Sequence, residues 1–155
     1  LWHSNHIVPA QEHVVSNIVR QKVLSAIDSL PLVHKERPLF LLLLPENEYH
    51  EIGLLFVYYL LRRKKIPVIY LGCSVPLKDI QTLAENKDPD FFYLHLTAFP
   101  RKHELARFIS TLGQKFPKIK IVLSGTLIQD YKKPLPSNMI KLQSVEQLLT
   151  FIKSL

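Results

Sequence analysis

The sequence predicts an α/β protein built on a flavodoxin-like, doubly wound parallel sheet of five strands, preceded by a long helix. Two observations lead to this prediction. A chain of 155 residues with 47% apolar and 21% charged residues has the composition of one globular domain, or of one domain with a fragment of another. After residue 38, short apolar runs alternate with helical patterns across short links, which is typical of parallel strands joined by helices.

The expected elements follow one another along the chain. Residues 10–30 carry apolar side chains at helical spacing, and Pro9 stands where such a helix would begin. Residues 31–38 read as a linker, so we expect domains at 1–36 and 37–155. The fully apolar run 39–44 is typical of a strand that is covered on both faces. Further strands are expected at 68–71, 91–96, 119–123 and 139–142, and further helices at 49–65, 77–86, 102–116, 126–131 and 145–155.

Composition and short motifs exclude several classes of function. The single cysteine, Cys73, excludes an internal disulfide and a zinc or iron–sulfur site built from cysteines. Neither Gly-x-Gly-x-x-Gly nor Gly-x-x-x-x-Gly-Lys occurs, so dinucleotide and nucleoside triphosphate binding lose their main support. The net charge of +7 is scattered, and its densest run, 62–65, suits the end of a helix.

The ends and the apolar runs of the chain bear on its location. No apolar run approaches the roughly 20 residues that span a membrane, and no signal peptide is visible. We therefore expect a cytoplasmic protein without membrane contact. The chain begins at Leu1 and its only methionine is Met139, so we also expect it to be a piece of a longer protein.

The loop after the first strand holds the candidate metal-binding residues. In a doubly wound sheet, ligands bind beyond the carboxyl ends of the strands. Within residues 45–53, Glu48 stands two residues before His50. A carboxylate that accepts the proton of one imidazole nitrogen leaves the other nitrogen free to bind a metal. Gly53, one turn on, would let a bulky ligand approach the backbone. A solvated loop at a helix start stays open as the alternative.

This loop and three other segments resemble the motifs of a known family. Glu-x-His-x-x-Gly at 48–53 is similar to the Asp-x-His-x-x-Gly signature of cobalamin-binding domains, which continues after about 41 residues with Ser-x-Leu and after 26–28 more with Gly-Gly. The same gaps lead here to His95-Leu96-Thr97 and to Ser124-Gly125. Trp2, followed after nine residues by Glu12-His13, resembles the Trp-x9-Glu-His motif of cobalamin-dependent regulators of the MerR type.

The resemblance implies a role for each matched residue. His50 would be the lower cobalt ligand, oriented by Glu48. His3 would become the upper ligand once light has cleaved the cobalt–carbon bond. The adenosyl group would be contacted by Trp2, Glu12 and His13. The nucleotide tail of the cofactor would be contacted by Ser124, Gly125 and Thr126.

Several positions depart from the family pattern. Glu48 replaces Asp, Ser124 replaces Gly, and Thr97 replaces Leu. The largest departure is His95, which stands where the family has the Ser that holds the buried base of the cofactor. Overpacking a close-packed slot in this way costs about 1–3 kcal/mol, unless the imidazole hydrogen-bonds the base from farther back. We expect bound cobalamin, with cobalt supplied by the cofactor, or no cofactor at all if His95 blocks the slot.

The resemblance favours a sensory domain of a MerR-type transcriptional regulator over an enzyme. Residues 1–36 would be the C-terminal part of a helical cap bundle and 37–155 a cobalamin-binding, Rossmann-like domain, with a DNA-binding domain before them. Such a protein would bind adenosylcobalamin, respond to light or cofactor level, and form homo-oligomers, either dimers or tetramers. Two alternatives stay open: a cofactor-free oligomerisation module, and a corrinoid-carrying subunit of a methyltransferase or mutase.

Overall fold

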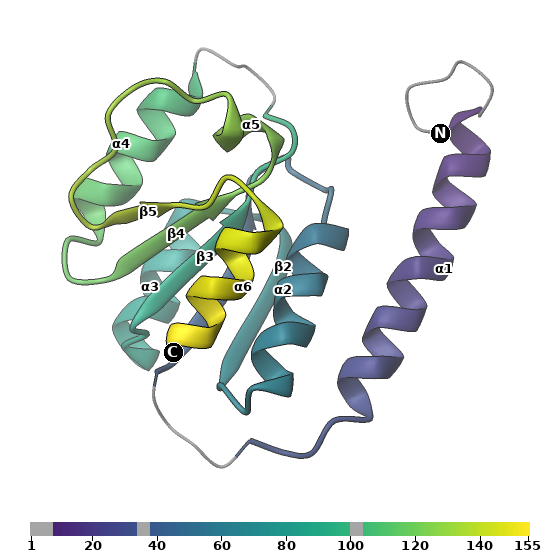
Figure 1. Ribbon diagram of the computed structural model, residues 1–155. Coiled ribbons are helices and arrows are strands. Elements are labelled where there is room, and N and C mark those ends of the chain that lie inside the picture. Colours follow the sequence, from purple (N-terminus) through teal and green to yellow (C-terminus); the bar gives the residue numbers. More distant parts are fainter. Residues whose placement is uncertain (1–7, 34–37, 100–103) are drawn as a thin grey trace.

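The computed structural model describes residues 8–33, 38–99 and 104–155, and its core is a sheet of five parallel strands. The strands lie in the order β2-β1-β3-β4-β5, which is the flavodoxin-like order that the sequence predicts, so that prediction is confirmed (Figure 1). The carboxyl ends of all five strands therefore meet at one edge. The bounds are β1 Phe40–Pro45, β2 Val68–Val75, β3 Phe91–His95, β4 Lys120–Ser124 and β5 Met139–Lys141.

Helices cover both faces of the sheet. Buried residues of α2 and α6 form one core with one face, and buried residues of α3, α4 and α5 form a second core with the other. Figure 1 shows these layers, with α6 in front of the sheet and α3 behind it. The bounds are α1 Pro9–Asp28, α2 Ile52–Arg63, α3 Leu77–Lys87, α4 Leu105–Lys115, α5 Thr126–Gln129 and α6 Val145–Ser154.

Strand β1 lies at the centre of both cores. All six of its residues are buried, as expected for an apolar run covered on both faces. Leu41 and Leu43 face the α3–α4 core, whereas Leu42 and Leu44 face the α2–α6 core. This alternation has the period of two that a strand imposes on its side chains.

Two elements at the carboxyl edge differ from their predicted bounds. Helix α2 begins at Ile52 rather than at residue 49, because residues 46–51 form a hydrogen-bonded loop. Strand β2 continues to Val75 rather than ending at residue 71, because Gly72 and Val75 still pair with Leu43 and Pro45 of β1, and the amide of Ser74 donates to the carbonyl of Glu48 at 3.1 Å. Both differences bring the loop after β1 against the end of β2.

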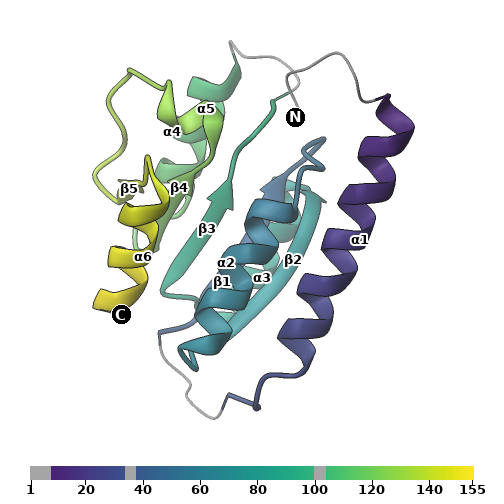
Figure 2. The ribbon, with the colours of Figure 1, turned by 45° about the vertical axis from the view of Figure 1, so that its right-hand side comes forward.

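Helix α1 stands beside α2, outside the two layers around the sheet. Ile27, near the C-terminal end of α1, is buried, whereas Val14, Val15 and Ile18 in its first half are 45–60% exposed. Figure 2 shows α1 alongside the α/β layers, with its N-terminal end on the side where the strands end. Among the described residues, no helix combines the length and the apolar character that crossing a membrane requires.

Candidate functional site

Three loops at the carboxyl edge of the sheet bring most of the predicted site residues together. The loop after β1 carries Glu48 and His50, the segment after β3 carries Thr97, and the turn after β4 carries Gly125. Direct contacts join them: the amide of Ala98 donates to Glu48 Oε2 at 2.6 Å. The edge is therefore one connected unit rather than three separate loops.

Glu48 is the buried anchor of this unit. Its side chain is inaccessible to solvent, and its Oε1 accepts hydrogen bonds from the amide of His50 at 2.9 Å and from His50 Nδ1 at 2.6 Å. Burial by itself raises the pKa of the Glu48 carboxyl, but the hydrogen bonds from His50 and Ala98 outweigh it and hold this pKa below its ordinary value. Glu48 is thus a carboxylate at neutral pH.

The carboxylate of Glu48 decides the tautomer of His50. An ionised carboxylate only accepts hydrogen bonds, so the proton of a neutral His50 ring must lie on Nδ1. The lone pair of Nε2 is then free, and the His50 side chain is 62% exposed at the edge of the sheet. A neutral imidazole in this state is ready to bind a metal through Nε2.

The backbone of the β1 loop is fixed from the side of β2. The amide of Asn47 donates to Ser74 Oγ at 3.1 Å, in addition to the bond between Ser74 and Glu48 given above. Asn47 and Ser74 both adopt left-handed backbone conformations, with φ of 66° and 53°. Residues held in this sparsely populated region are characteristic of tightly determined turns. His50 therefore projects from a preorganised loop.

His95 fills the space beneath this loop, between α2 and β4. Its Nδ1 lies 2.8 Å from Ser124 Oγ, and the hydroxyl of Tyr93 donates to the same Ser124 oxygen at 2.7 Å. A Cβ atom placed on Gly53 would lie 2.3 Å from both Cδ2 and Nε2 of the His95 ring. The ring is therefore packed against the backbone of Gly53 and lies between Gly53 and Ser124.

The surroundings of His95 favour its neutral form. Burial lowers the pKa of its imidazole below the ordinary value, and the charge of Glu48 opposes this only in part. Burial likewise raises the pKa of Tyr93 to about 12, so Tyr93 stays a hydrogen-bond donor. Tyr93, Ser124 and His95 form a hydrogen-bonded chain of neutral groups on the α2–α6 face.

Gly125 allows the segments after β3 and β4 to touch. Its φ is 98°, and a Cβ atom there would lie 2.3 Å from the carbonyl oxygen of Leu96. The amide of Leu96 donates to the carbonyl of Ser124 at 2.8 Å, and Thr126 Oγ1 donates to the carbonyl of Thr97 at 3.2 Å. The predicted residues of these two segments thus contact each other through backbone atoms.

Two of the predicted residues of the N-terminal segment lie on helix α1 rather than on these loops. Glu12 and His13 are exposed on the first half of α1. Trp2 and His3 lie outside the described residues. Within 8–33, 38–99 and 104–155, no group of three or more His, Cys, Asp or Glu residues is placed to hold a metal ion.

Sequence reasoning missed a second carboxylate, Glu51, next to the site. Its Oε2 accepts the hydroxyl of Tyr70 at 2.6 Å, and its Oε1 pairs with the guanidinium of Arg20 on α1. Burial raises the pKa of Glu51, but these two partners outweigh it and leave the pKa below its ordinary value. Tyr93 was also missed, although it stands two residues before His95 and so shares its face of β3.

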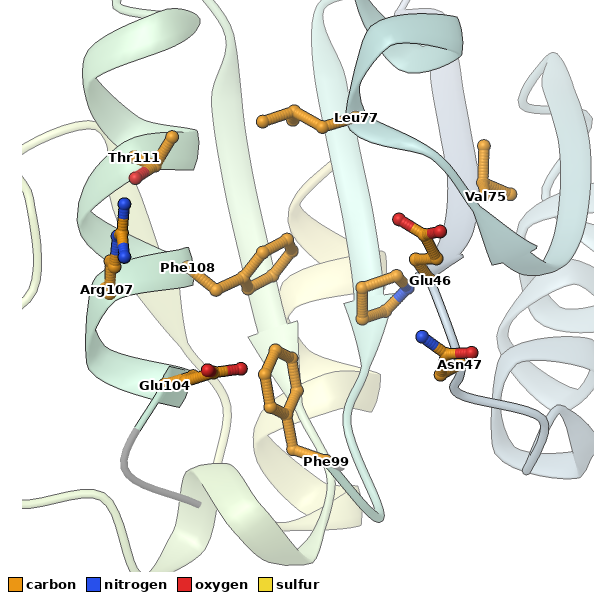
Figure 3. Close-up of a pocket in the computed structure, with 10 residues that line it drawn as sticks. Glu46, Asn47, Val75, Leu77, Phe99, Glu104, Arg107, Phe108 and Thr111 are labelled. Carbon is orange, nitrogen blue, oxygen red and sulfur yellow. The ribbon is translucent and has the colours of Figure 1, made fainter. Parts of the chain in front are cut away.

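A separate pocket lies on the other face of the same edge. It has a volume of about 440 Å³ and lies between the loop after β1 and helix α4. Figure 3 shows Phe99 and Phe108 between Glu46, on that loop, and Arg107, on the helix. This pocket does not include Glu48, His50 or His95 in its lining.

Comparisons with known proteins find relatives of the sequence and a solved structure with a similar fold. The chain is 33% identical over 117 residues to the HTH-type transcriptional repressor CarH of Myxococcus xanthus, covering 76% of this chain and 38% of the repressor. It is 27% identical over 124 residues to the repressor CarA of the same organism, covering 80% of this chain and 43% of CarA. The chain thus spans about two fifths of the length of these relatives. No family model matches it.

A solved structure shares the fold. A cobalamin-binding protein from Desulfitobacterium hafniense DCB-2 superposes with a TM-score of 0.52 at 18% sequence identity. The match covers 76% of this chain and 57% of that protein. At this identity, the likeness concerns the arrangement of strands and helices.

Proposed function

This chain is a homologue of the HTH-type transcriptional repressors CarH and CarA, and from that premise we propose that it is the cobalamin-binding, sensory part of a transcriptional regulator. Such a part binds its cofactor and turns over no substrate. The corrinoid-carrying subunit remains the alternative, and the relationship to repressors favours the regulator.

The pair of Glu48 and His50 is the observation that carries this proposal. No hydrogen bond to His50 Nε2 is found among the described residues, and the His50 side chain is 62% exposed, while Nδ1 is held by a buried carboxylate. A histidine backed in this way is a stronger metal ligand than a free one, because the carboxylate fixes its tautomer and raises its basicity. His50 would hold the cobalt of a corrinoid from below, and the bound group would supply a cobalt–carbon bond whose cleavage is the signal.

The residues around His50 suit a corrinoid at the cobalt ligand, but they do not suit the nucleotide tail beneath it. Glu48 occupies its acceptor position in spite of the extra methylene relative to Asp, because the amide of Ala98 satisfies its second oxygen. Gly125 keeps the adjoining turn tight. The space between Gly53 and Ser124, however, is taken by the His95 ring.

We propose the remaining properties of the regulator on the strength of the relationship. The cofactor form is adenosylcobalamin, with Trp2, Glu12 and His13 on its upper side. Residues 1–36 belong to a helical cap, and residues 37–155 form the cofactor domain. A further domain contacts DNA, and the whole protein works in the cytoplasm as a homo-oligomer.

Titration with cobalamin tests the central proposal. Aquacobalamin added to the purified chain in the dark should give the absorption change of imidazole coordination. His50→Ala should weaken binding by about tenfold or more, and free imidazole should restore the spectrum of this variant, because only the ligand is missing. Absence of any spectral change or heat of binding up to millimolar cofactor, for every corrinoid tried, would exclude the proposal.

The light response has its own test. The chain loaded with adenosylcobalamin should elute from a size-exclusion column at a different volume in the dark and after green light. His3→Ala should abolish the difference, since the upper position of cobalt would lack its new ligand. Identical elution in both states would rule out the switch and leave cofactor binding intact.

A further inference from the structure

The region beneath His50 holds a side chain where a tailed cofactor needs space. His95 lies between Gly53 and Ser124, directly on the face of the sheet that α2 covers. The hypothetical Cβ distance of 2.3 Å at Gly53 shows that even one added carbon atom would overlap the ring. The ring thus takes space that a group the size of an aromatic base would need at this place.

The ring is held there by its neighbours. Ser124 is 6% exposed and lies 2.8 Å from His95 Nδ1. Tyr93, 1% exposed, fixes the Ser124 hydroxyl from the other side. Swinging the ring out would break the bond between His95 and Ser124 and leave a buried hydroxyl with one partner fewer, so the observed position is the stable one.

The position of the His95 ring bears on where the nucleotide tail of a corrinoid could lie. Cobalt in a corrinoid has one lower axial position, and the base on the nucleotide tail of cobalamin competes with a protein imidazole for it. If His50 held the cobalt, the base would be displaced and, still tethered to the corrinoid, would need space on the side of His50. The resemblance places the nucleotide tail at Ser124, Gly125 and Thr126 and its base at the position of His95. The ring of His95 lies against Gly53 and 2.8 Å from Ser124 Oγ, where that base would lie.

Resting on the proposed function, we propose that this chain binds corrinoids whose lower nucleotide tail is absent or truncated more tightly than it binds cobalamin, and that His95 determines this preference. Such corrinoids bring the same cobalt to His50 but place no base between α2 and β4. The selectivity arises from exclusion rather than from a new attraction.

The experiment compares two corrinoids on three proteins. Diaquacobinamide, which has no nucleotide tail, and aquacobalamin are titrated into the wild-type chain, His95→Ser and His95→Gln, and imidazole coordination is followed by absorbance. In the wild type, cobalamin should bind at least about tenfold more weakly than cobinamide. His95→Ser should reduce this ratio by about tenfold, because it removes the ring. His95→Gln, which keeps a long side chain within reach of Ser124, should retain the ratio.

Each outcome separates this inference from the function on which it rests. If neither corrinoid binds any of the three proteins, the proposed function fails. If both bind and the ratio of their dissociation constants is the same in the wild type and in His95→Ser, cobalamin binding stands and the role of His95 is wrong. If His95→Ser binds both corrinoids more tightly than the wild type by the same factor, the ring obstructs the whole site and the proposed selectivity is also wrong. Far-ultraviolet circular dichroism checks that each variant is folded.

Discussion

Replacing Gly53 by Ala should destabilise the chain only while the His95 ring is present. The added methyl carbon would lie 2.3 Å from two ring atoms, well inside contact distance. Overpacking of this kind costs about 1–3 kcal/mol. Without the ring, the same substitution should stabilise helix α2 by up to about 1 kcal/mol, because alanine loses less backbone freedom than glycine.

A double-mutant cycle isolates the contact. Gly53→Ala is made in the wild type and in His95→Ser, and urea unfolding of all four proteins gives the free energies of unfolding. The interaction free energy of the cycle, the cost of Gly53→Ala in the wild type minus its effect in His95→Ser, should be about 1–4 kcal/mol, which for a chain of 155 residues corresponds to a difference of several degrees in Tm.

Gly113 on α4 provides the matched control. A Cβ atom there would lie 2.7 Å from the ring of Pro136, so Gly113→Ala also creates a clash, but not with His95. Its effect should be the same in both backgrounds to within about 0.5 kcal/mol. If Gly53→Ala behaves as additively as Gly113→Ala, the ring does not fill the space beside Gly53 and the reasoning is refuted.

Three further predictions concern stability. As the pH falls below 6.5, His95 should take up a proton in the unfolded chain before it does so in the folded chain. The free energy of unfolding should therefore fall by at most about 1.4 kcal/mol per pH unit. In urea unfolding at pH 7 and pH 5, His95→Gln should lose less of its free energy of unfolding than the wild type does. Gly125→Ala should cost about 1–3 kcal/mol through its positive φ and its contact with Leu96, measured by the same unfolding assay. Arg20→Ala should speed hydrogen exchange in α1 while changing overall stability by less than about 1 kcal/mol, because its pair with Glu51 is half exposed.

The strands and helices could be predicted because the patterns that encode them are local. The run 39–44 is apolar without interruption, and the strand found there, Phe40–Pro45, is buried on both sides. Helical spacing over 10–30 likewise predicted α1. These features depend on burial and on period, which a short window of sequence carries.

The contents of the site could be predicted only in part, because its contacts join distant segments. The pairing of Glu48 with His50 spans two residues and was expected from the motif. The packing of His95 on Gly53 depends on the rotamer of a side chain 42 positions along the chain. The position of that ring follows from Tyr93 and Ser124, and no local pattern specifies such a rotamer.

Glu51 gives the site a mechanical connection that its neighbours in sequence do not reveal. It follows His50 directly in the chain, and its carboxylate holds Arg20 of helix α1 on one oxygen and Tyr70 of β2 on the other. The loop that carries His50 is therefore connected to α1 through one peptide unit and the ion pair between Glu51 and Arg20. If a partner that repositions α1 changed the affinity of the edge for a ligand at His50, that ligand would, by thermodynamic reciprocity, change the affinity for the partner by the same factor. The side chain of Glu51 forms this connection between α1 and the loop.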